Sequence, residues 1–366
     1  MSNSKPIIIV GIDIGGANTK AALVVFNNGS IALSFSIIEY FPFWEKSIKQ
    51  IPEMLFNIRD NLLQKAGVEN SEISYFAIAI TAELSDAFQT KREGINVITK
   101  ALSQVFDEEK LFFISTNGHF IKIDDVFQDF SQICAANWVS TALFLGEYAK
   151  DGILIDSGST TIDLIPVING TPSTQGRSDL GRLSHHELIY TGGLRATIPS
   201  ITHFVPIDNN LIRISFEKFA LISDVHLILN NISEREYFND TADNRSKSMK
   251  DCYARLSRII CADLESVSND QLFNIANYIY QKQLKLISSE IKLFLEGTEK
   301  RLPEITNSPK FFITGLSAKF LIKPVLEKLG YNEIYNYEEK TNIPDNISSS
   351  AFALAGALYF QLYKGS

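Results

Sequence analysis

The chain carries one short pattern at two widely separated places. GIDIGGANTKAALV at residues 11–24 and LIDSGSTTIDLIPV at residues 154–167 each hold Asp-x-Gly between apolar runs, and an Asn-Gly turn follows each of them. Two copies of a strand–turn–strand unit indicate an internal duplication. Because 366 residues exceed what a single hydrophobic core ordinarily holds, the sequence predicts two lobes.

Strand and helix patterns alternate along the whole chain, which predicts an α/β fold. Before residue 150, strands are expected at 6–15, 19–26, 30–40, 73–80 and 111–115, with helices at 45–66, 94–106 and 135–149. We expect a first lobe over 1–149 and a second over 150–347, the second with a helical insertion at about 215–297. A last helix over 348–366 is expected to pack back on the first lobe.

The first turn has the composition of a phosphate cradle. Gly15 and Gly16 allow backbone N–H groups to approach a ligand, and Asn18, Thr19 and Lys20 add donors and a positive charge. A tight hairpin without a ligand is the plainer interpretation of a lone Gly-Gly pair. The second copy of the pattern favours the phosphate site.

The second turn supplies small hydroxyls and free N–H groups from Ser157, Gly158, Ser159 and Thr160. If the halves are duplicated, the two turns are expected to face each other across a cleft and to grip the two ends of a phosphate chain. Asp13 and Asp156 stand at strand ends just before the turns, where carboxylate oxygens hold Mg²⁺ through its waters. Asp163 lies in an apolar strand, so we expect it to be paired or to face the cleft as a third metal-site residue.

Two further positions are candidates for ligand binding. Gly315 ends a strand just before a helix and would let a flat group or a phosphate approach the backbone, although a plain strand-to-helix turn fits equally well. Asn137 either caps a helix or binds substrate.

The turns at Asp13 and Asp156, together with Gly315 and the Ala-Gly helix at Gly356, resemble the phosphate, adenosine and second connecting motifs of actin-like ATPases. This resemblance implies a duplicated actin/hexokinase-like (ribonuclease H-like) two-lobed fold. Gly-Leu-Ser replaces the usual Gly-Gly pair at the adenosine motif, so ATP is not expected to be required.

A closer resemblance covers nearly the whole chain and is to the hydantoinase/oxoprolinase-like proteins linked to tetrahydromethanopterin and methanofuran pathways. Its motifs are GIDIGGANTKAA (11–22), ITAELSDAFQTKREG (80–94), AANW (135–138), GILIDSGSTTIDLIPV (152–167), GRLSHHELIYTGGLRATIP (181–199), TAD (241–243) and RLSRIICAD (255–263). The resemblance implies a transferase of methanofuran-type C1 cofactor biosynthesis. Its substrates would be an aminomethylfuran-methyl diphosphate and the phenolic amine γ-glutamyltyramine, and pyrophosphate would leave.

Such a reaction needs charge stabilisation and a base. Mg²⁺, Lys20 and the turn amides would stabilise pyrophosphate, and Glu83 or His186 would accept the phenol proton. Glu83 is also compatible with a structural role at a helix start, and His185 and His186 are expected on opposite sides of a strand. Three arginines, which could instead lie on a solvated loop face, are candidates for binding the diphosphate or the glutamate carboxylates: Arg177, Arg182 and Arg195.

Composition excludes several other classes. A formal net charge of −8 argues against a nucleic-acid partner, and no apolar run is long enough to span a bilayer. Three scattered cysteines fit a reducing cytoplasm. A homodimer is left open, and the alternatives are an ATP-dependent kinase, a hydantoinase/oxoprolinase-like hydrolase of the same superfold, or a non-enzymatic sensor of a phosphorylated metabolite.

Overall fold

The computed structural model describes residues 5–363, which form two compact units. Within this range, unit 1 comprises the chain up to Gly152, then Ile165–Arg182, and the chain from Tyr335 onward. Unit 2 comprises Ile153–Leu164 and Leu183–Ile334. Residues 165–182 and 335–347, which the sequence assigned to the second lobe, pack in unit 1.

The sheet of unit 1 starts from the first copy of the repeated pattern. Its strands are β1 (Ile7–Gly15), β2 (Asn18–Asn27), β3 (Ser30–Tyr40), β4 (Tyr75–Thr81), β5 (Leu111–Ile114) and β6 (Phe120–Ile121), in the order β3-β2-β1-β4-β5-β6. The expected hairpin turn is present, with φ of 49° at Asn28 and 85° at Gly29. β4 runs parallel to β1, so the carboxyl ends of both strands meet at one edge.

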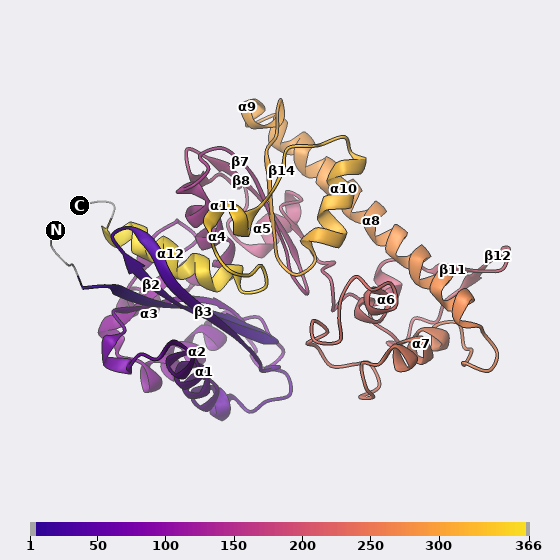
Figure 1. Cartoon of the computed structure of the whole chain (residues 1–366), viewed down its shortest axis with the longest axis horizontal. Coiled ribbons are helices and arrows are strands. Elements are labelled where there is room, and N and C mark those ends of the chain that lie inside the picture. Colours follow the sequence, from indigo (N-terminus) through magenta and orange to yellow (C-terminus); the bar gives the residue numbers. More distant parts are fainter. Residues whose placement is uncertain (1–4, 364–366) are drawn as a thin grey trace. The chain divides into compact units, whose positions relative to one another are not determined.

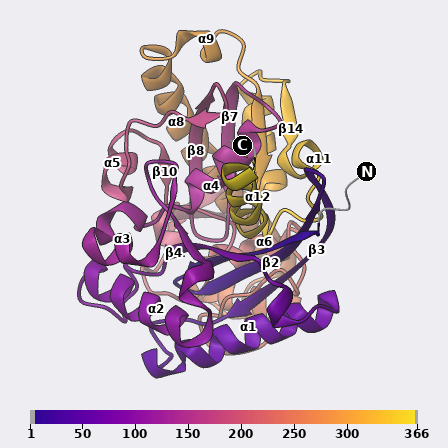
Figure 2. The ribbon, with the colours of Figure 1, turned by 90° about the vertical axis from the view of Figure 1, so that its left-hand side faces the viewer.

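Helices cover both faces of this sheet. They are α1 (Ile51–Ala66), α2 (Lys91–Val105), α3 (Ile123–Gln128), α4 (Asn137–Gly146), α11 (Tyr337–Thr341) and α12 (Ser349–Tyr363). α1 and α2 lie on one face and α12 on the other in both Figure 1 and Figure 2. α12 is buried on nearly all sides, because it packs against both α4 and β1.

α12 lies very close to β1. A Cβ on Gly11 of β1 would stand 2.0 Å from the carbonyl oxygen of Ala351, so only glycine allows this approach. On another side of the helix, a Cβ on Gly356 would stand 2.2 Å from the ring of Phe144 in α4. The small residues of the last helix thus permit close packing within unit 1.

The second sheet repeats the strand order of the first. Its strands are β7 (Gly152–Ser157), β8 (Ile162–Ile168), β10 (Leu188–Ile189), β13 (Phe311–Thr314) and β14 (Ile334–Asn336), in the order β10-β8-β7-β13-β14, with β9 (Thr171–Pro172) beside β8. This order corresponds strand by strand to β3-β2-β1-β4-β5, and β13 runs parallel to β7 as β4 does to β1. The internal duplication is therefore confirmed.

The helical insertion of unit 2 follows a small hairpin of β11 (Phe204–Ile207) and β12 (Asn210–Arg213). It contains α6 (Ile222–Ile228), α7 (Met249–Arg258) and α8 (Asn269–Glu299), which pack on one another. The remaining α-helices are α5 (Asp179–Ser184), α9 (Pro303–Thr306) and α10 (Lys323–Lys328), and a π-helical turn spans Ala318–Ile322. Among the described residues, no helix combines the length and apolar character needed to cross a bilayer.

A buried ion pair organises the insertion. Arg255 of α7 contacts the carboxylate of Asp224 in α6 at 2.8 Å, and both side chains are inaccessible to solvent. Arg255 also bonds Asp243 at 3.1 Å, which ties down the polar segment between α6 and α7. Removing one partner would leave an uncompensated buried charge.

The contact between α12 and α4 gives a matched pair of glycine substitutions. Gly356→Val places a side chain inside the Phe144 ring, so we expect a loss of roughly 2–3 kcal/mol in the free energy of unfolding. Gly297→Ala in α8 meets no atom within 4 Å and should instead stabilise by about 0.5–1 kcal/mol. Urea unfolding of both variants and the parent measures the two effects, and equal behaviour of the two variants would contradict this packing.

Candidate functional site

The first turn, between β1 and β2, is closed tightly. A Cβ on Gly15 would stand 2.6 Å from the carbonyl oxygen of Asn18, whereas one on Gly16 would meet only ordinary contacts. Backbone N–H groups of the segment 41–43 donate to the turn carbonyls of residues 16 and 17. The side-chain oxygens of Asn18 and Thr19 are buried and have no hydrogen-bond partner among the described residues. Unpartnered buried oxygens at this turn are compatible with a ligand that supplies donors or a cation.

Asp13 stands at the end of β1 with only 4% of its surface exposed. Its carboxylate accepts hydrogen bonds from the Ser350 hydroxyl at 2.6 Å, the Asn137 amide at 3.3 Å and the Thr81 hydroxyl at 3.4 Å. Lys20 is its cross-strand neighbour, so the two side chains leave the same face of the sheet. These three hydrogen bonds therefore fix the orientation of the carboxylate. Its oxygens, rather than the donors around them, are the hard ligands that a cation held through water would use.

Asn137 does not cap α4, which was one of the two roles that the sequence suggested. The residue at the cap position of α4 is Ala136, and it makes no side-chain cap. Asn137 instead donates to Asp13 through its amide nitrogen and accepts from the backbone N–H of Trp138 through its amide oxygen. Asn137 thus orients the carboxylate of Asp13.

Glu83 follows β4 and is 1% exposed. Burial raises its pKa from 4.5 to about 7, against the opposing effect of Lys91, while Asp179 raises it further. Neither carboxylate oxygen accepts a hydrogen bond from another described residue, and the Lys91 ammonium lies 3.8 Å from Oε1. Gly94 of α2 packs against the Glu83 backbone, where a Cβ would stand 2.6 Å from the carbonyl oxygen. A buried carboxyl group that titrates near neutrality is a typical candidate for acid–base chemistry.

The second turn, between β7 and β8, is held by hydrogen bonds from a neighbouring segment of the chain. Gly158 donates to the carbonyl of Thr161 at 2.9 Å and so closes the turn. Four backbone N–H groups of the segment 192–195 donate to the carbonyls of residues 158–160. With these carbonyls engaged, the segment fixes the orientation of the turn's peptide groups.

Gly315 and Ser317, which follow β13, pack against Ser157 of the second turn. Gly315 has φ of 91°, and a Cβ there would stand 2.4 Å from the carbonyl oxygen of Ser157. The hydroxyl groups of Ser317 and Ser157 are 2.7 Å apart, and the Ser317 backbone N–H donates to the Ser157 carbonyl at 2.9 Å. The segment after β13 is therefore built onto the second turn.

Asp156, Asp163 and His186 also lie in unit 2. Asp163 pairs with Leu188 across β8 and β10 and is half-buried. His186 lies beyond the end of α5 in a left-handed conformation, with φ of 57°, so the expected strand over the two histidines is wrong. Its Nδ1 lies 2.8 Å from the Glu290 carboxylate, and its side chain is 38% exposed.

The three arginines do not share one environment. Arg177 and Arg182 belong to unit 1 and Arg195 to unit 2. The exposed Arg177 donates to the side chain of Asn117. Arg182 is 1% exposed and its guanidinium lies 4.5 Å from the Trp138 ring centre, so a solvated loop face is excluded for Arg182.

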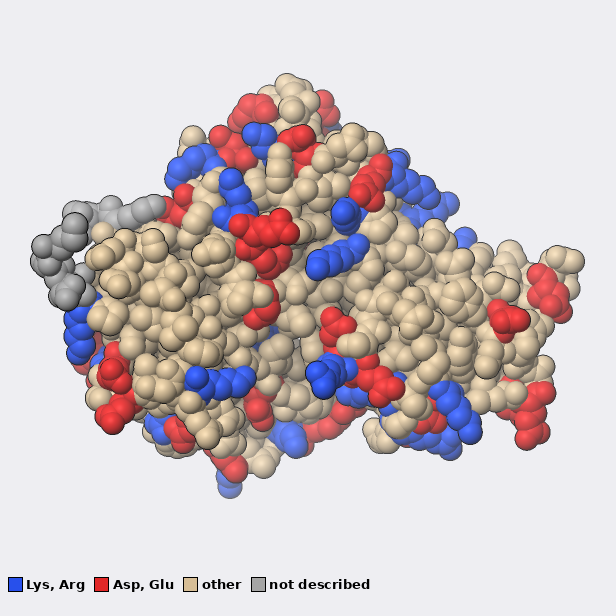
Figure 3. Space-filling view, in the orientation of Figure 1, with Lys and Arg blue, Asp and Glu red and all other residues tan. Residues whose placement is uncertain are grey.

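No group of three or more His, Cys, Asp or Glu side chains suited to a metal is gathered within residues 5–363. Asp13 belongs to unit 1, whereas Asp156 and Asp163 belong to unit 2. Acidic and basic side chains are interspersed over the face seen in Figure 3, so this face presents no continuous field of one sign.

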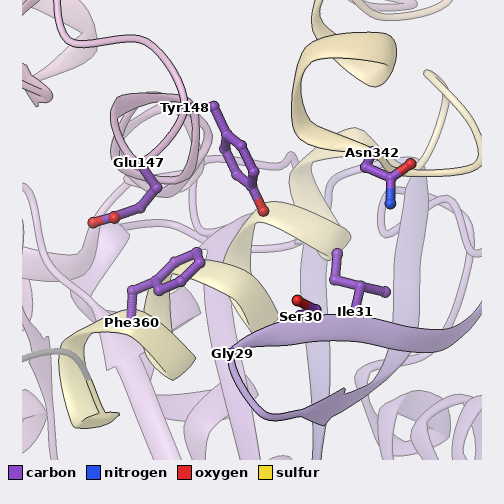
Figure 4. A pocket seen from close by; sticks show the side chains of 7 residues that line it. All are labelled: Gly29, Ser30, Ile31, Glu147, Tyr148, Asn342 and Phe360. Atoms are coloured by element: carbon purple, nitrogen blue, oxygen red, sulfur yellow. The ribbon is translucent and has the colours of Figure 1, made fainter.

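A separate pocket of about 250 Å³ lies in unit 1 (Figure 4). Tyr148, Asn342 and Ile31 point into it, and Phe360 and Glu147 lie at its side. None of the predicted site residues lines this pocket.

Known proteins resemble this chain along almost its full length. The model of the family described as hydantoinase/oxoprolinase matches residues 75–359. A curated (4-{4-[2-(gamma-L-glutamylamino)ethyl]phenoxymethyl}furan-2-yl)methanamine synthase of Methanocaldococcus jannaschii is 34% identical over 359 residues, which are 98% of this chain and 99% of the relative. A synthase of the same name from Methanococcus vannielii is 29% identical over 208 residues, 56% of this chain and 90% of the relative.

Among solved structures, a nucleotide-free acetone carboxylase superposes with a TM-score of 0.56 at 11% identity, covering 96% of this chain and 70% of that one. At this identity the likeness bears on the fold alone. Together with the repeated strand order, it confirms the duplicated actin-like architecture with a helical insertion in the second half.

The burial of Glu83 predicts how stability changes with pH. The folded protein keeps Glu83 protonated up to about pH 7, whereas the unfolded chain ionises it near 4.5. The wild-type free energy of unfolding should therefore fall relative to that of Glu83→Gln by about 1.4 kcal/mol per pH unit between these values. Urea unfolding at several pH values measures the difference.

Glu234→Gln, at an exposed position, is the control and should follow the wild type across the same window. A difference between wild type and Glu83→Gln that stays constant with pH would show that Glu83 is ionised throughout.

Proposed function

Because the chain belongs to the hydantoinase/oxoprolinase family, we propose that it is a transferase of methanofuran-type C1 cofactor biosynthesis. It would join an aminomethylfuran-methyl diphosphate to γ-glutamyltyramine. The carrying observation is the 34% identity to the Methanocaldococcus jannaschii synthase over 98% of this chain and 99% of that protein. The chain is an enzyme, since both curated relatives are synthases. These synthases are named after a product in which a phenoxymethyl group is attached to a furan. The proposed reaction forms an ether bond of this kind.

The proposed step balances without an oxidant or a nucleotide. The phenol oxygen forms a bond to the furan's methylene carbon, and the bond between that carbon and the diphosphate oxygen breaks. Pyrophosphate leaves with the bonding electrons, and the phenol proton passes to a base. The step as written uses no ATP. The three cysteines form no disulfides, which is typical of proteins in a reducing cytoplasm, and we expect the reaction to take place there.

Glu83 is the better of the two candidate bases. A phenol with a pKa near about 10 is mostly neutral at pH 7, so its proton must be accepted as the ether bond forms. The pKa of Glu83, raised to about 7 by burial, suits proton transfer at neutral pH. His186 is held by Glu290 and is more than a third exposed, which suits a structural contact equally well.

Each Asp-x-Gly turn is proposed to bind phosphate oxygens through its backbone N–H groups. In the first turn Asn18 and Thr19 add side-chain contacts, and Lys20 adds a positive charge. In the second, the residues are Ser157, Gly158, Ser159 and Thr160, with Gly315 behind them. The arginines Arg177, Arg182 and Arg195 stay candidates for binding the diphosphate or the free carboxylate of the glutamyl group.

Asp13 is the residue proposed to hold Mg²⁺, with Asp156 and Asp163 as further candidates. The three hydrogen bonds to the Asp13 carboxylate orient its oxygens, which would hold the cation. Mg²⁺ would supply charge neutralisation for the departing pyrophosphate.

An assay of the purified protein with both substrates and Mg²⁺ tests the function. We expect equimolar pyrophosphate and coupled ether product, and we expect EDTA to stop the reaction and excess Mg²⁺ to restore it. ATP should neither be consumed nor required. If no pyrophosphate and no ether form while ATP is hydrolysed or transferred, the proposed function is wrong and the kinase or hydrolase is correct.

Substitutions separate the two candidate bases. Glu83→Gln should lower kcat by roughly 10²–10⁴-fold, because general-base catalysis typically contributes this much. His186→Gln should lower kcat much less than Glu83→Gln, because His186 is held by Glu290 in a contact that suits a structural role. Wild-type activity should rise with pH up to an apparent pKa near 7. The reverse ranking of the two variants would assign the base to His186.

A further inference from the structure

The segment Thr191–Arg195 lies directly on the second turn. Gly192 donates to the carbonyl of Thr160 at 2.9 Å, and Gly193 donates to that of Gly158 at 3.0 Å. The next two N–H groups donate to the carbonyl of Ser159 at 2.9 and 3.1 Å. A Cβ on Gly192 would stand 2.6 Å from the Gly158 oxygen, so only glycine allows this contact. We call residues 191–195 the clamp segment.

The clamp segment is itself held by one side chain of the insertion. Gln283 of α8 is fully buried. Its amide nitrogen donates to the Thr191 hydroxyl at 3.1 Å and to the Gly192 carbonyl at 3.1 Å. A buried amide with both donors used in this way fixes the start of the clamp segment.

His226 of α6 fixes which way the Gln283 amide points. Burial lowers the pKa of His226 to about 3, so the ring is neutral. Its Nδ1 lies 3.1 Å from the Asn231 amide nitrogen and accepts a hydrogen bond, which leaves the proton on Nε2. Nε2 then donates to the Gln283 amide oxygen at 3.0 Å. With its oxygen on His226, the Gln283 amide must direct its nitrogen to the clamp segment.

We propose that Gln283 is a positioning residue of the phosphate site, through which the helical insertion sets the geometry of the second turn. The inference rests on the proposed function in one respect, that this turn binds the diphosphate. Gln283 touches no reacting atom in this scheme. It acts through the clamp segment, and every contact in the chain from His226 to Gly158 lies within unit 2.

Three variants test the proposal. Gln283→Met keeps the length of the side chain but removes both donors and the acceptor. Thr191→Val removes a single hydroxyl, at nearly constant volume, and is the milder change should Gln283→Met fail to fold. Ile287→Ala is the matched control, because Ile287 is fully buried on the same face of α8, one turn from Gln283, and has no hydrogen bond to lose.

Two measurements are made on each full-length variant. Amide hydrogen exchange without ligand reports on residues 158–161 and 192–195, and titration with Mg²⁺ and inorganic pyrophosphate gives Kd. Gln283→Met should speed exchange in both segments and raise the Kd for pyrophosphate by about tenfold or more. Thr191→Val should also speed exchange and should raise that Kd by about threefold. Ile287→Ala should lower global stability and leave local exchange and Kd near the wild-type values.

The outcomes separate this proposal from the proposed function. Unchanged exchange at 158–161 in both Gln283→Met and Thr191→Val would overturn the positioning role, whatever the ligand. Equal effects of Ile287→Ala and Gln283→Met on exchange and Kd would also overturn it, since loss of stability would then explain both. If exchange is faster in the variants but the wild type binds no pyrophosphate, the link between Gln283 and the second turn stands and only the diphosphate function is refuted.

Discussion

Unit 1 depends on how closely α12 approaches β1. The carbonyl of Ala351 occupies the space that a side chain on Gly11 would need, so the helix backbone lies directly on the strand. This approach brings Ser350 within 2.6 Å of the Asp13 carboxylate two residues further along β1. Thr81 and Asn137 reach the same carboxylate from the end of β4 and the start of α4. The packing of α12, β4 and α4 around β1 thus fixes the position of the Asp13 carboxylate.

Much of this arrangement follows from local sequence patterns. The Asp-x-Gly repeats, the Asn-Gly turn and the apolar runs predict the strands and the duplication, because turn chemistry and alternation depend on neighbouring residues. Ser350 and Thr81 were not recognised as partners of Asp13, since hydroxyl residues at element ends are common. The approach of α12 places Ser350 there, and the pairing of β4 with β1 places Thr81. A missing side chain at Gly11, in an otherwise apolar strand, was the available signal.

Other differences arise where tertiary packing overrides local pattern. The chain bends sharply after α5, so His186 takes a left-handed conformation and lies against Glu290 instead of in a strand. Arg182 of α5 is buried against Trp138, although arginine usually faces solvent. The raised pKa of Glu83 arises from burial, with a further contribution from Asp179 that Lys91 opposes, so no local motif encodes it. Such departures from ordinary burial rules are concentrated at functional sites.

The two sheets share a strand order but differ in what joins the third strand to the fourth. In the first half, residues 41–74 make this connection, with α1 as its long helix; in the second half, residues 190–310 make it and include the whole insertion. Lengthening a connection adds little entropic cost to closing it, so a duplicated sheet tolerates a large new segment at this point. Duplication therefore separates two tasks within one polypeptide. One copy can keep a short connection while the other acquires a module in which new contacts can evolve.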